Sequence, residues 1–226
     1  MNSASLQAVA FDLDGLIANS EDLYELAGDE VLARRGKTHD ATLREQMMGR
    51  PVVDSLRIMI EYHALPDPLN TLMDECRQVL ERLMDTSLAP MPGFHDLVDE
   101  LLAADIPIAV ATSGTRVYAD DVLTRLAIKE RFRFVLTSED IKHGKPAPDV
   151  YLLAAQRFQI EPARMLVLED SANGCRAGVA AGAFTVAVPN RHTQDHDFVG
   201  AAFIADTLAD PRIRQVVRGC RDDLPS

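Results

Sequence analysis

Short continuous apolar runs alternate with amphipathic helical segments from Pro92 onward, and this alternation limits the folds open to the chain. Strands buried on both faces of a parallel sheet have such runs, whereas half-exposed strands alternate apolar and polar residues. We therefore predict an α/β protein whose parallel sheet is covered by helices on both faces. The predicted strands are Ile106–Ala111, Phe134–Leu136, Met165–Leu168, Phe184–Val188 and the less apolar Ala202–Ile204. The predicted helices are Phe94–Ala104, Val117–Leu126, Asp149–Phe158 and Ala172–Ala181.

A long helical block separates this region from the first predicted strand, Ala8–Phe11. Residues 18–88 show helical periodicity, and apolar residues recur every three or four positions from Leu69 to Met84, which predicts one long amphipathic helix. We predict a Rossmann-like core domain from residues 1–17 and 89–226, and an all-helical cap domain inserted at 18–88. A helical layer fused into the main core is the alternative.

Two carboxylates directly follow the first predicted strand, in the segment Asp12-Leu13-Asp14-Gly15. Glycine tolerates backbone angles that other residues avoid, so the Asp-Gly step favours an end to the strand. Ligands of open parallel sheets bind at the carboxyl ends of the strands. The two acids are therefore candidate site residues, although Asp and Gly are also ordinary turn residues.

Three further polar clusters accompany the predicted strands. Thr112-Ser113-Gly114 follow one strand, Glu169-Asp170-Ser171 follow another, and Lys145 lies in a loop. Each cluster has a structural explanation of its own, as a hydroxyl helix cap, an acidic helix N-terminus and a loop lysine. If the strands are parallel neighbours, however, the acids and the hydroxyls meet at one edge of the sheet, within reach of Lys145.

Carboxylates gathered at one sheet edge repel one another unless a cation lies among them. Mg²⁺ suits such a site, because it binds few protein carboxylates, keeps water ligands and is often completed by phosphate oxygens. Lys145 would add a positive charge, and the Thr112 hydroxyl a hydrogen-bond donor. A carboxylate can also attack phosphorus and form an aspartyl-phosphate while metal and lysine stabilise the transferring group. The clusters therefore favour metal-dependent phosphoryl transfer.

Composition limits the partners and the compartment. The net charge of −12 argues against a nucleic-acid partner, and it would repel an anionic substrate unless a local cation reversed the field. The three cysteines are few and have no metal-ligand spacing, which indicates a reducing compartment. No apolar run approaches the roughly 18 residues of a membrane span, and the first residues lack signal-peptide features. We expect a cytoplasmic protein without a membrane partner, as a monomer or weak dimer.

Taken together and in this order, the four clusters resemble the four motifs of the haloacid dehalogenase (HAD) superfamily. The resemblance is carried by Phe11-Asp12-Leu13-Asp14-Gly15, by Gly144-Lys145-Pro146-Ala147-Pro148-Asp149 and by Leu168-Glu169-Asp170-Ser171 with Gly174. The helical insertion after the first motif resembles the small C1-type cap of this superfamily. Within it, the chain is most similar to the β-phosphoglucomutase-like sugar-phosphate phosphatases.

The resemblance implies a role for each motif residue. Asp12 would be the nucleophile, and Asp14 would protonate the leaving alkoxide and later activate the hydrolytic water. Thr112 and Lys145 would hold the transferring phosphoryl group, with Ser113 and Gly114 as substrate-binding neighbours. The bound Mg²⁺ would take its ligands from a set of four residues. These are the Asp12 and Asp170 carboxylates, the main-chain carbonyl of Asp14, and Glu169 directly or through water.

Two alternatives to a phosphatase stay open. The mutases of this group carry a histidine ten residues after the general acid, where this chain has Tyr24, and this favours hydrolysis over a β-phosphoglucomutase-type reaction. A catalytically silent binding protein is disfavoured, because every reactive position is filled.

Arg50 could contact the anionic part of a substrate when the cap closes, or could be a surface arginine. We expect the substrate to be a small phosphorylated metabolite, most simply a sugar phosphate.

Overall fold

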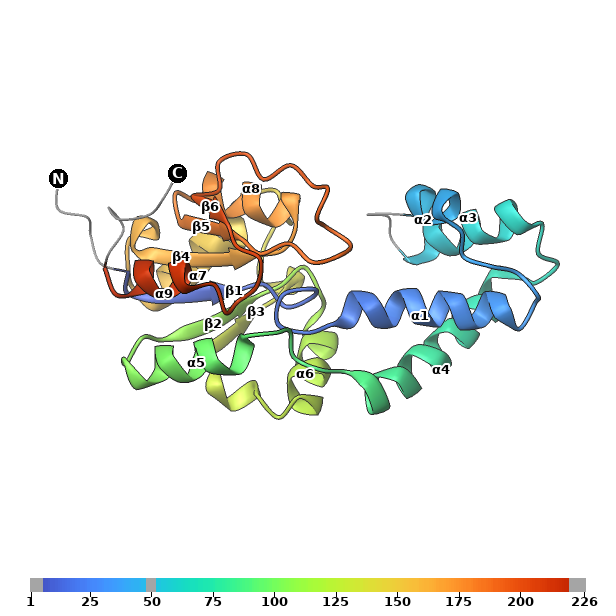
Figure 1. Ribbon diagram of the computed structural model, residues 1–226, viewed down its shortest axis with the longest axis horizontal. Coiled ribbons are helices and arrows are strands. Elements are labelled where there is room, and N and C mark those ends of the chain that lie inside the picture. Colours follow the sequence, from blue (N-terminus) through green and yellow to red (C-terminus); the bar gives the residue numbers. More distant parts are fainter. Residues whose placement is uncertain (1–5, 48–51, 220–226) are drawn as a thin grey trace. The chain divides into compact units, whose positions relative to one another are not determined.

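The structure is a computed structural model that describes residues 6–47 and 52–219 (Figure 1). The chain divides into two compact units. One unit contains the residues up to Asn19 together with those from Ala89 onward, and the other is Ser20–Leu88. The chain thus leaves the first unit after its first strand and returns to it about seventy residues later.

Six strands of the described chain form a single sheet, in which every pair of neighbours is parallel. The order across the sheet is β3-β2-β1-β4-β5-β6, which is the Rossmann order. The predicted α/β class is therefore confirmed. The strands are β1 Ala8–Phe11, β2 Ile108–Ala111, β3 Phe134–Leu136, β4 Met165–Glu169, β5 Phe184–Ala187 and β6 Phe203–Ile204.

The direction of winding reverses between β1 and β4. The chain moves outward from β1 through β2 to β3, and then crosses back to place β4 on the other side of β1. In open parallel sheets such a switch point creates a crevice outside the carboxyl ends of the two strands, because the connections leave in opposite directions. The carboxyl ends of β1 and β4 are therefore the expected ligand position.

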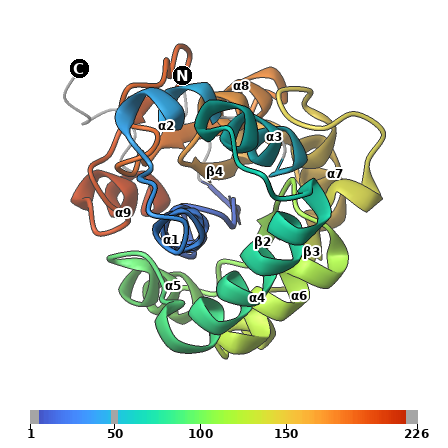
Figure 2. The ribbon, with the colours of Figure 1, turned by 90° about the vertical axis from the view of Figure 1, so that its right-hand side faces the viewer.

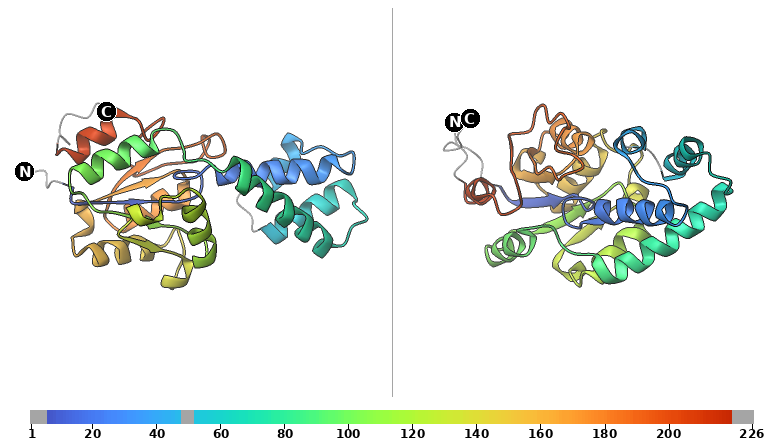
Figure 3. Two further views of the ribbon diagram at one scale, coloured as in Figure 1. Left: turned by 90° about the horizontal axis from the view of Figure 1, so that it is seen from below. Right: turned by 45° about the vertical axis from the view of Figure 1, so that its right-hand side comes forward.

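Helices cover both faces of the sheet because the strand residues are apolar on both sides. Ala8 and Ala10 of β1 share a buried cluster with the helices α7 and α8. Phe11 points to the opposite face, where its ring meets Phe94 of α5 edge-on at a centroid distance of 6.1 Å. Figure 3 shows α5 and α9 together on this second face. The helices of this unit are α5 Phe94–Ala103, α6 Arg116–Arg125, α7 Asp149–Phe158, α8 Ala172–Ala180 and α9 Pro211–Val217.

Most predicted elements agree with the structure to within one or two residues, and the start of β2 shows why they differ. The apolar run begins at Ile106, but the strand begins at Ile108. Pro107 has no amide hydrogen, and it contributes to the ladder only through its carbonyl, which accepts a hydrogen bond from Val9 N at 3.1 Å. Short 3₁₀ turns punctuate the connections at Lys129–Arg131, Ser138–Asp140 and Pro162–Arg164.

All the secondary structure in the described residues of the second unit is helical, with α1 packed against α4 and α2 against α3 (Figure 2). Apolar residues from all four helices form its core, with Val31, Leu43 and Leu72 fully buried. The unit spans Ser20–Leu88, compared with the predicted 18–88, and its action as a cap stays a prediction. The helices are α1 Ser20–Ala33, α2 Ala41–Met47, α3 Val52–His63 and α4 Leu69–Ser87.

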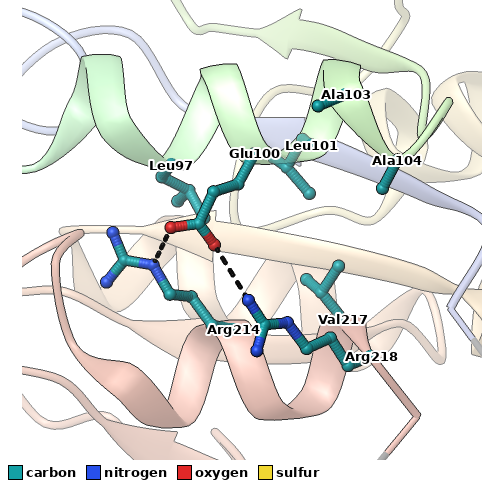
Figure 4. Close-up of a pocket in the computed structure, with 8 residues that line it drawn as sticks. All are labelled: Leu97, Glu100, Leu101, Ala103, Ala104, Arg214, Val217 and Arg218. Carbon is teal, nitrogen blue, oxygen red and sulfur yellow. Dashed lines mark hydrogen bonds and ion pairs between the residues drawn. The ribbon is translucent and has the colours of Figure 1, made fainter.

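A groove of about 260 Å³ lies between α5 and α9 (Figure 4). Glu100 of α5 crosses it and pairs with Arg214 at 2.7 Å and with Arg218 at 3.7 Å. The part of α5 that lines the groove leads directly into the amino end of β2. The groove therefore lies away from the carboxyl ends of the strands, and its lining includes none of the predicted site residues.

In the described residues, no helix combines the length and the apolar composition needed to cross a membrane.

Candidate active site

Polar residues lie at the carboxyl ends of three adjacent strands, at one edge of the sheet. Asp12 follows β1, and its amide donates to the Leu168 carbonyl at 3.0 Å. Thr112 follows β2, and its amide donates to the Leu136 carbonyl at 3.0 Å. Glu169 is the last residue of β4. Because β2, β1 and β4 are parallel neighbours, their carboxyl ends coincide, and the structure brings these predicted site residues together as the strand pattern suggests.

The chain turns between Leu13 and Ala18, shortly after Asp12. Gly15 has a φ of 73°, a left-handed conformation that a side chain would disfavour. Its amide donates to the Ala18 carbonyl at 2.8 Å, and the Ala18 amide donates to the Leu13 carbonyl at 3.0 Å. β1 ends at Phe11 and the chain turns at the Asp14-Gly15 step, so the two acids lie between the end of the strand and this compact turn.

Lys145 is the cation of the site. Its side chain is buried, and Nζ donates to Asp12 Oδ1 at 2.5 Å, to Glu169 Oε1 at 2.6 Å and to the Ala111 carbonyl at 2.8 Å. An ammonium has three hydrogens, and each of these acceptors can take one. Lys145 thus links the ends of β1, β2 and β4. To contact a phosphoryl oxygen, it would have to exchange one of these partners.

Glu169 is completely buried, and its carboxylate is surrounded by donors. Besides Lys145, the Tyr151 hydroxyl of α7 donates to Oε1 at 2.5 Å, and the Ser171 hydroxyl donates to Oε2 at 3.2 Å. A Cβ at Gly174 would lie 1.9–2.0 Å from the carboxylate atoms, so this position of α8 requires glycine. These donors offset the cost of burying the charge.

The other two acids of the site have amide and phenol partners. Asp170 is 2% exposed, and its Oδ2 accepts a hydrogen bond from Asn190 Nδ2 at 3.0 Å. The same amide donates to the Gly15 carbonyl at 3.1 Å, which ties the turn after β1 to the end of β4. Asp14 Oδ1 accepts a hydrogen bond from the Tyr118 hydroxyl at 2.5 Å.

The electrostatics of the cluster favour an added cation. Burial raises the pKa of Asp12 to about 8; the Glu169 and Asp14 carboxylates add to the rise, and the Lys145 ammonium opposes it. Burial alone would lower the pKa of Lys145, but the neighbouring Asp12 and Glu169 carboxylates raise it by a larger amount. The net shift of the Lys145 pKa is therefore upward. One ammonium does not balance the carboxylates of Asp12, Glu169 and Asp170. A divalent cation beside them would oppose this upward shift and favour the ionised form of Asp12.

The donor set fits a hard metal ion. Asp12, Glu169 and Asp170 each offer a carboxylate oxygen, and these atoms lie within 4.8 Å of one another. Mg²⁺ and related ions prefer oxygen ligands of this kind. Among the described residues, the Asp14 carboxylate is not part of this group. The buried acidic cluster of Asp12, Glu169 and Asp170 can therefore hold a metal.

The remaining predicted residues have different surroundings. Thr112 is 1% exposed, and its Oγ1 accepts a hydrogen bond from the Gly114 amide at 2.9 Å, so the hydroxyl belongs to the turn after β2. The Gly114 carbonyl accepts a hydrogen bond from the Ser138 amide at 3.0 Å, and Ser113 is exposed on the same turn. Arg50 lies outside the described residues.

Sequence reasoning missed three side chains that contact the acids. Tyr151 is a phenol on the buried face of α7, and a buried hydroxyl needs a partner, which is a signal that could have pointed to Glu169. Asn190 follows the apolar run that forms β5. Like the acids, it is a polar residue just after a strand, so it could have been expected at the same edge of the sheet. Tyr118 had no such signal, because it lies within a helix and the sequence does not show which acid its hydroxyl reaches.

These observations define a class of protein: an α/β enzyme of Rossmann-like topology with a buried acidic centre suited to a cation. The sequence matches the model of the haloacid dehalogenase-like hydrolase family over residues 9–188. The chain therefore belongs to the haloacid dehalogenase-like hydrolase family, and the resemblance seen in its motifs is confirmed.

Relatives and a solved structure support this assignment. The chain is 29% identical over 208 residues to the bifunctional riboflavin kinase/FMN phosphatase of Arabidopsis thaliana, covering 92% of this chain and 55% of that protein. It therefore spans about half the length of this relative. It is 30% identical over 177 residues to the phosphorylated carbohydrates phosphatase of Thermotoga maritima, covering 78% and 82%. The crystal structure of CbbY from Rhodobacter sphaeroides with phosphate is 28% identical, with a TM-score of 0.72 over 90% of this chain and 95% of that chain.

Proposed function

We propose that this protein is a Mg²⁺-dependent phosphomonoesterase that hydrolyses a small phosphorylated metabolite through an aspartyl-phosphate. The observation that carries the proposal is the contact of Lys145 Nζ with both Asp12 and Glu169 at the switch point of the sheet. A buried carboxylate beside a lysine and two further acids provides a nucleophile, a positive charge and metal ligands in one place. Phosphoryl transfer uses this combination, because charge accumulates on the transferring oxygens.

In the first step, a carboxylate oxygen of Asp12 attacks phosphorus. The bond between phosphorus and the substrate alcohol breaks, and Asp14 gives its proton to the departing oxygen. Lys145 and Thr112 donate hydrogen bonds to the phosphoryl oxygens. The products of this step are the free alcohol and an aspartyl-phosphate on Asp12.

In the second step, water replaces the enzyme as the partner of phosphorus. Asp14, now a carboxylate, accepts a proton from the attacking water, and the bond between Asp12 and phosphorus breaks. Inorganic phosphate is released, and both acids return to their starting states. Asp14 thus acts first as acid and then as base, and no other proton carrier is required.

The residues that would hold Mg²⁺ are Asp12, Asp170 and the main-chain carbonyl of Asp14, with Glu169 directly or through water. The bound ion would neutralise part of the negative charge that the acids and the phosphoryl group bring together. This also explains how a chain with a net charge of −12 can bind an anion. The tight engagement of Glu169 with Lys145 and Tyr151 favours a water-mediated contact for that residue.

For the substrate, we propose a sugar phosphate or a compound of similar size. The names of two relatives, a phosphorylated carbohydrates phosphatase and an FMN phosphatase, support a phosphorylated small molecule. Tyr24, which is 41% exposed on α1, replaces the histidine of the mutases and supports hydrolysis over isomerisation. The action of residues 18–88 as a cap, the cytoplasmic location and the monomeric or weakly dimeric state stay predictions.

The decisive experiment is phosphate release from a panel of phosphomonoesters, with and without Mg²⁺, by the wild type and by Asp12→Asn. We expect Mg²⁺-dependent turnover that Asp12→Asn lowers at least about 1,000-fold, because the nucleophile is lost. Asp121→Asn, which changes an exposed carboxylate on α6, is the control and should keep full activity. Undiminished activity in Asp12→Asn would contradict the nucleophile assignment. Interconversion of sugar-phosphate isomers without phosphate release would show a mutase instead.

A further inference from the structure

Tyr118 directs its phenol at Asp14. The hydroxyl donates to Asp14 Oδ1 at 2.5 Å, across a separation of 104 residues in the chain. Asp14 lies on the turn after β1, and Tyr118 lies in the first turn of α6, which follows β2. Since β1 and β2 are parallel neighbours, both segments begin at the same edge of the sheet.

The turn that begins α6 holds the Tyr118 ring in place. Thr115 is the N-cap of the helix, and its side chain accepts a hydrogen bond from the Tyr118 amide. A Cβ at Gly114 would lie only 2.9 Å from Tyr118 Cδ1, so the ring packs against backbone that carries no side chain. The Gly114 amide is in turn bonded to Thr112 Oγ1 at 2.9 Å. The position of the phenol is therefore fixed by packing and hydrogen bonds at the end of β2, and the side chain of Tyr118 has little freedom to rotate away.

An anchored donor on Asp14 matters for proton transfer. A general acid is effective only when its carboxyl group is aligned with the departing oxygen, and small misalignments are costly. A short hydrogen bond between a hydroxyl and a carboxylate oxygen is among the stronger ones in proteins. It restricts the side-chain torsions of Asp14, which is only partly buried.

We propose that Tyr118 is a positioning residue that holds Asp14 in the orientation for protonating the leaving group. It does not touch the reacting atoms; it acts through Asp14. This inference rests on the proposed function, in which Asp14 is the general acid and base.

The test is Tyr118→Phe, which keeps the ring beside Gly114 and removes only the hydroxyl. kcat/KM is measured for an alkyl phosphate and for an aryl phosphate whose leaving group is an acidic phenol. An alkoxide needs the proton of Asp14, whereas the phenolate departs without it. kcat/KM includes only the steps up to this departure, so the later role of Asp14 as a base does not enter. We expect kcat/KM to fall about 10-fold for the alkyl phosphate and less than about 2-fold for the aryl phosphate.

The ratio of the two kcat/KM values is the decisive quantity, because a partly unfolded preparation lowers both equally and leaves their ratio unchanged. Tyr62→Phe is the matched control: the Tyr62 hydroxyl donates to Asp40 at 2.9 and 3.1 Å in the helical unit, and its loss should not change the ratio. An unchanged ratio in Tyr118→Phe would overturn the inference and leave the phosphatase proposal intact. A wild type without turnover on any phosphomonoester would instead overturn the proposed function, and the inference with it.

Discussion

The residues of the site illustrate how a protein keeps an acid buried. Glu169 has no exposed surface, and yet Lys145, Tyr151 and Ser171 all donate to its two oxygens. A buried carboxylate without partners would cost several kcal/mol. Here each donor comes from a different part of the chain, so the carboxylate also joins the loop of Lys145 to α7 and to the start of α8. Its position is therefore defined as tightly as that of a core residue.

At the same scale, the amide of Asn190 orients Asp170, a carboxylate that can bind the metal. We predict that Asn190→Ala weakens Mg²⁺ binding about 10- to 100-fold, because a ligand without its supporting hydrogen bond loses its fixed orientation. Titration calorimetry with Mg²⁺ measures the affinity directly and does not depend on turnover. Asn70→Ala, an exposed position on α4, should leave the affinity unchanged. Equal affinities in Asn190→Ala and the wild type would contradict this supporting role.

At the scale of elements, α8 packs unusually close to the sheet. Its N-cap Ser171 accepts a hydrogen bond from the Gly174 amide at 3.1 Å, which fixes the first turn next to Glu169. One turn later, a Cβ at Gly178 would lie 2.6 Å from Thr185 Oγ1 of β5. The glycines of this helix therefore let its backbone approach both the acidic cluster and the sheet.

We predict that Gly174→Ala lowers the free energy of unfolding by about 1–3 kcal/mol and also reduces activity, because the new methyl group must displace the Glu169 carboxylate. Urea unfolding measures the first effect. Gly144→Ala is the control: its Cβ would meet no atom within 4 Å, so stability should change by less than about 1 kcal/mol. If both variants lose the same stability, close packing at Gly174 is not the cause.

At the same scale, Arg35 connects α1 to α4 and to Asp67 within the helical unit. Its guanidinium binds both oxygens of Asp67 at 2.9 and 3.0 Å, Glu75 of α4 at 2.6 Å and the Val31 carbonyl of α1 at 2.8 Å. The hydrogen bonds from Arg35 lower the pKa of Asp67 and that of Glu75. The two carboxylates thus contribute stability while they are ionised, and the contribution is lost as the pH falls through their folded-state pKa values.

We predict that Arg35→Gln makes the unit less sensitive to acid. In the wild type the contribution is complete above the ordinary pKa values of 3.8 and 4.5 and disappears at lower pH. The fall in melting temperature between about pH 6 and about pH 3.5 should therefore be smaller in Arg35→Gln than in the wild type. Arg57→Gln, which removes an exposed pair with Asp54, serves as the control. An unchanged acid response in Arg35→Gln would count against this link.

At the scale of the whole molecule, the two core residues that flank the inserted unit, Asn19 and Ala89, lie side by side. The Asn19 amide donates to the Ala89 carbonyl at 3.1 Å, and the Ala89 amide donates to Asn19 Oδ1 at 2.9 Å. The sheet, its covering helices and the acidic cluster all lie outside Ser20–Leu88. The chain therefore leaves the core for the insertion and returns to it at two adjacent residues that are hydrogen-bonded to each other.

We predict that replacing Ser20–Leu88 by a short glycine linker leaves a folded core that still binds Mg²⁺. The paired ends need little chain to connect them, and no strand is removed. Thermal unfolding followed by circular dichroism, with and without Mg²⁺, tests both points: a cooperative transition that shifts upward with the metal is expected. A shortened chain without a cooperative transition would show that the core depends on the insertion.

Local patterns were enough to predict much of the fold and part of the site. Asp12, Thr112 and Glu169 could be placed together, because the carboxyl ends of neighbouring parallel strands coincide and each residue directly follows an apolar run. Asn190 obeys the same rule and could have been included. Tyr118 could not, because the sequence does not reveal which phenol on a neighbouring helix reaches a given acid.

The amino-acid sequence by itself determined the α/β class, the helical insertion and the family, because these depend on periodicity and on motifs of a few contiguous residues. Only the tertiary structure decided how the charges of the site are shared. The contacts of Lys145 with Asp12 and Glu169, of Tyr151 with Glu169, and of Tyr118 with Asp14 each join segments distant in the chain. Hydrogen bonds depend on distances of tenths of an ångström, which packing sets and sequence patterns do not contain.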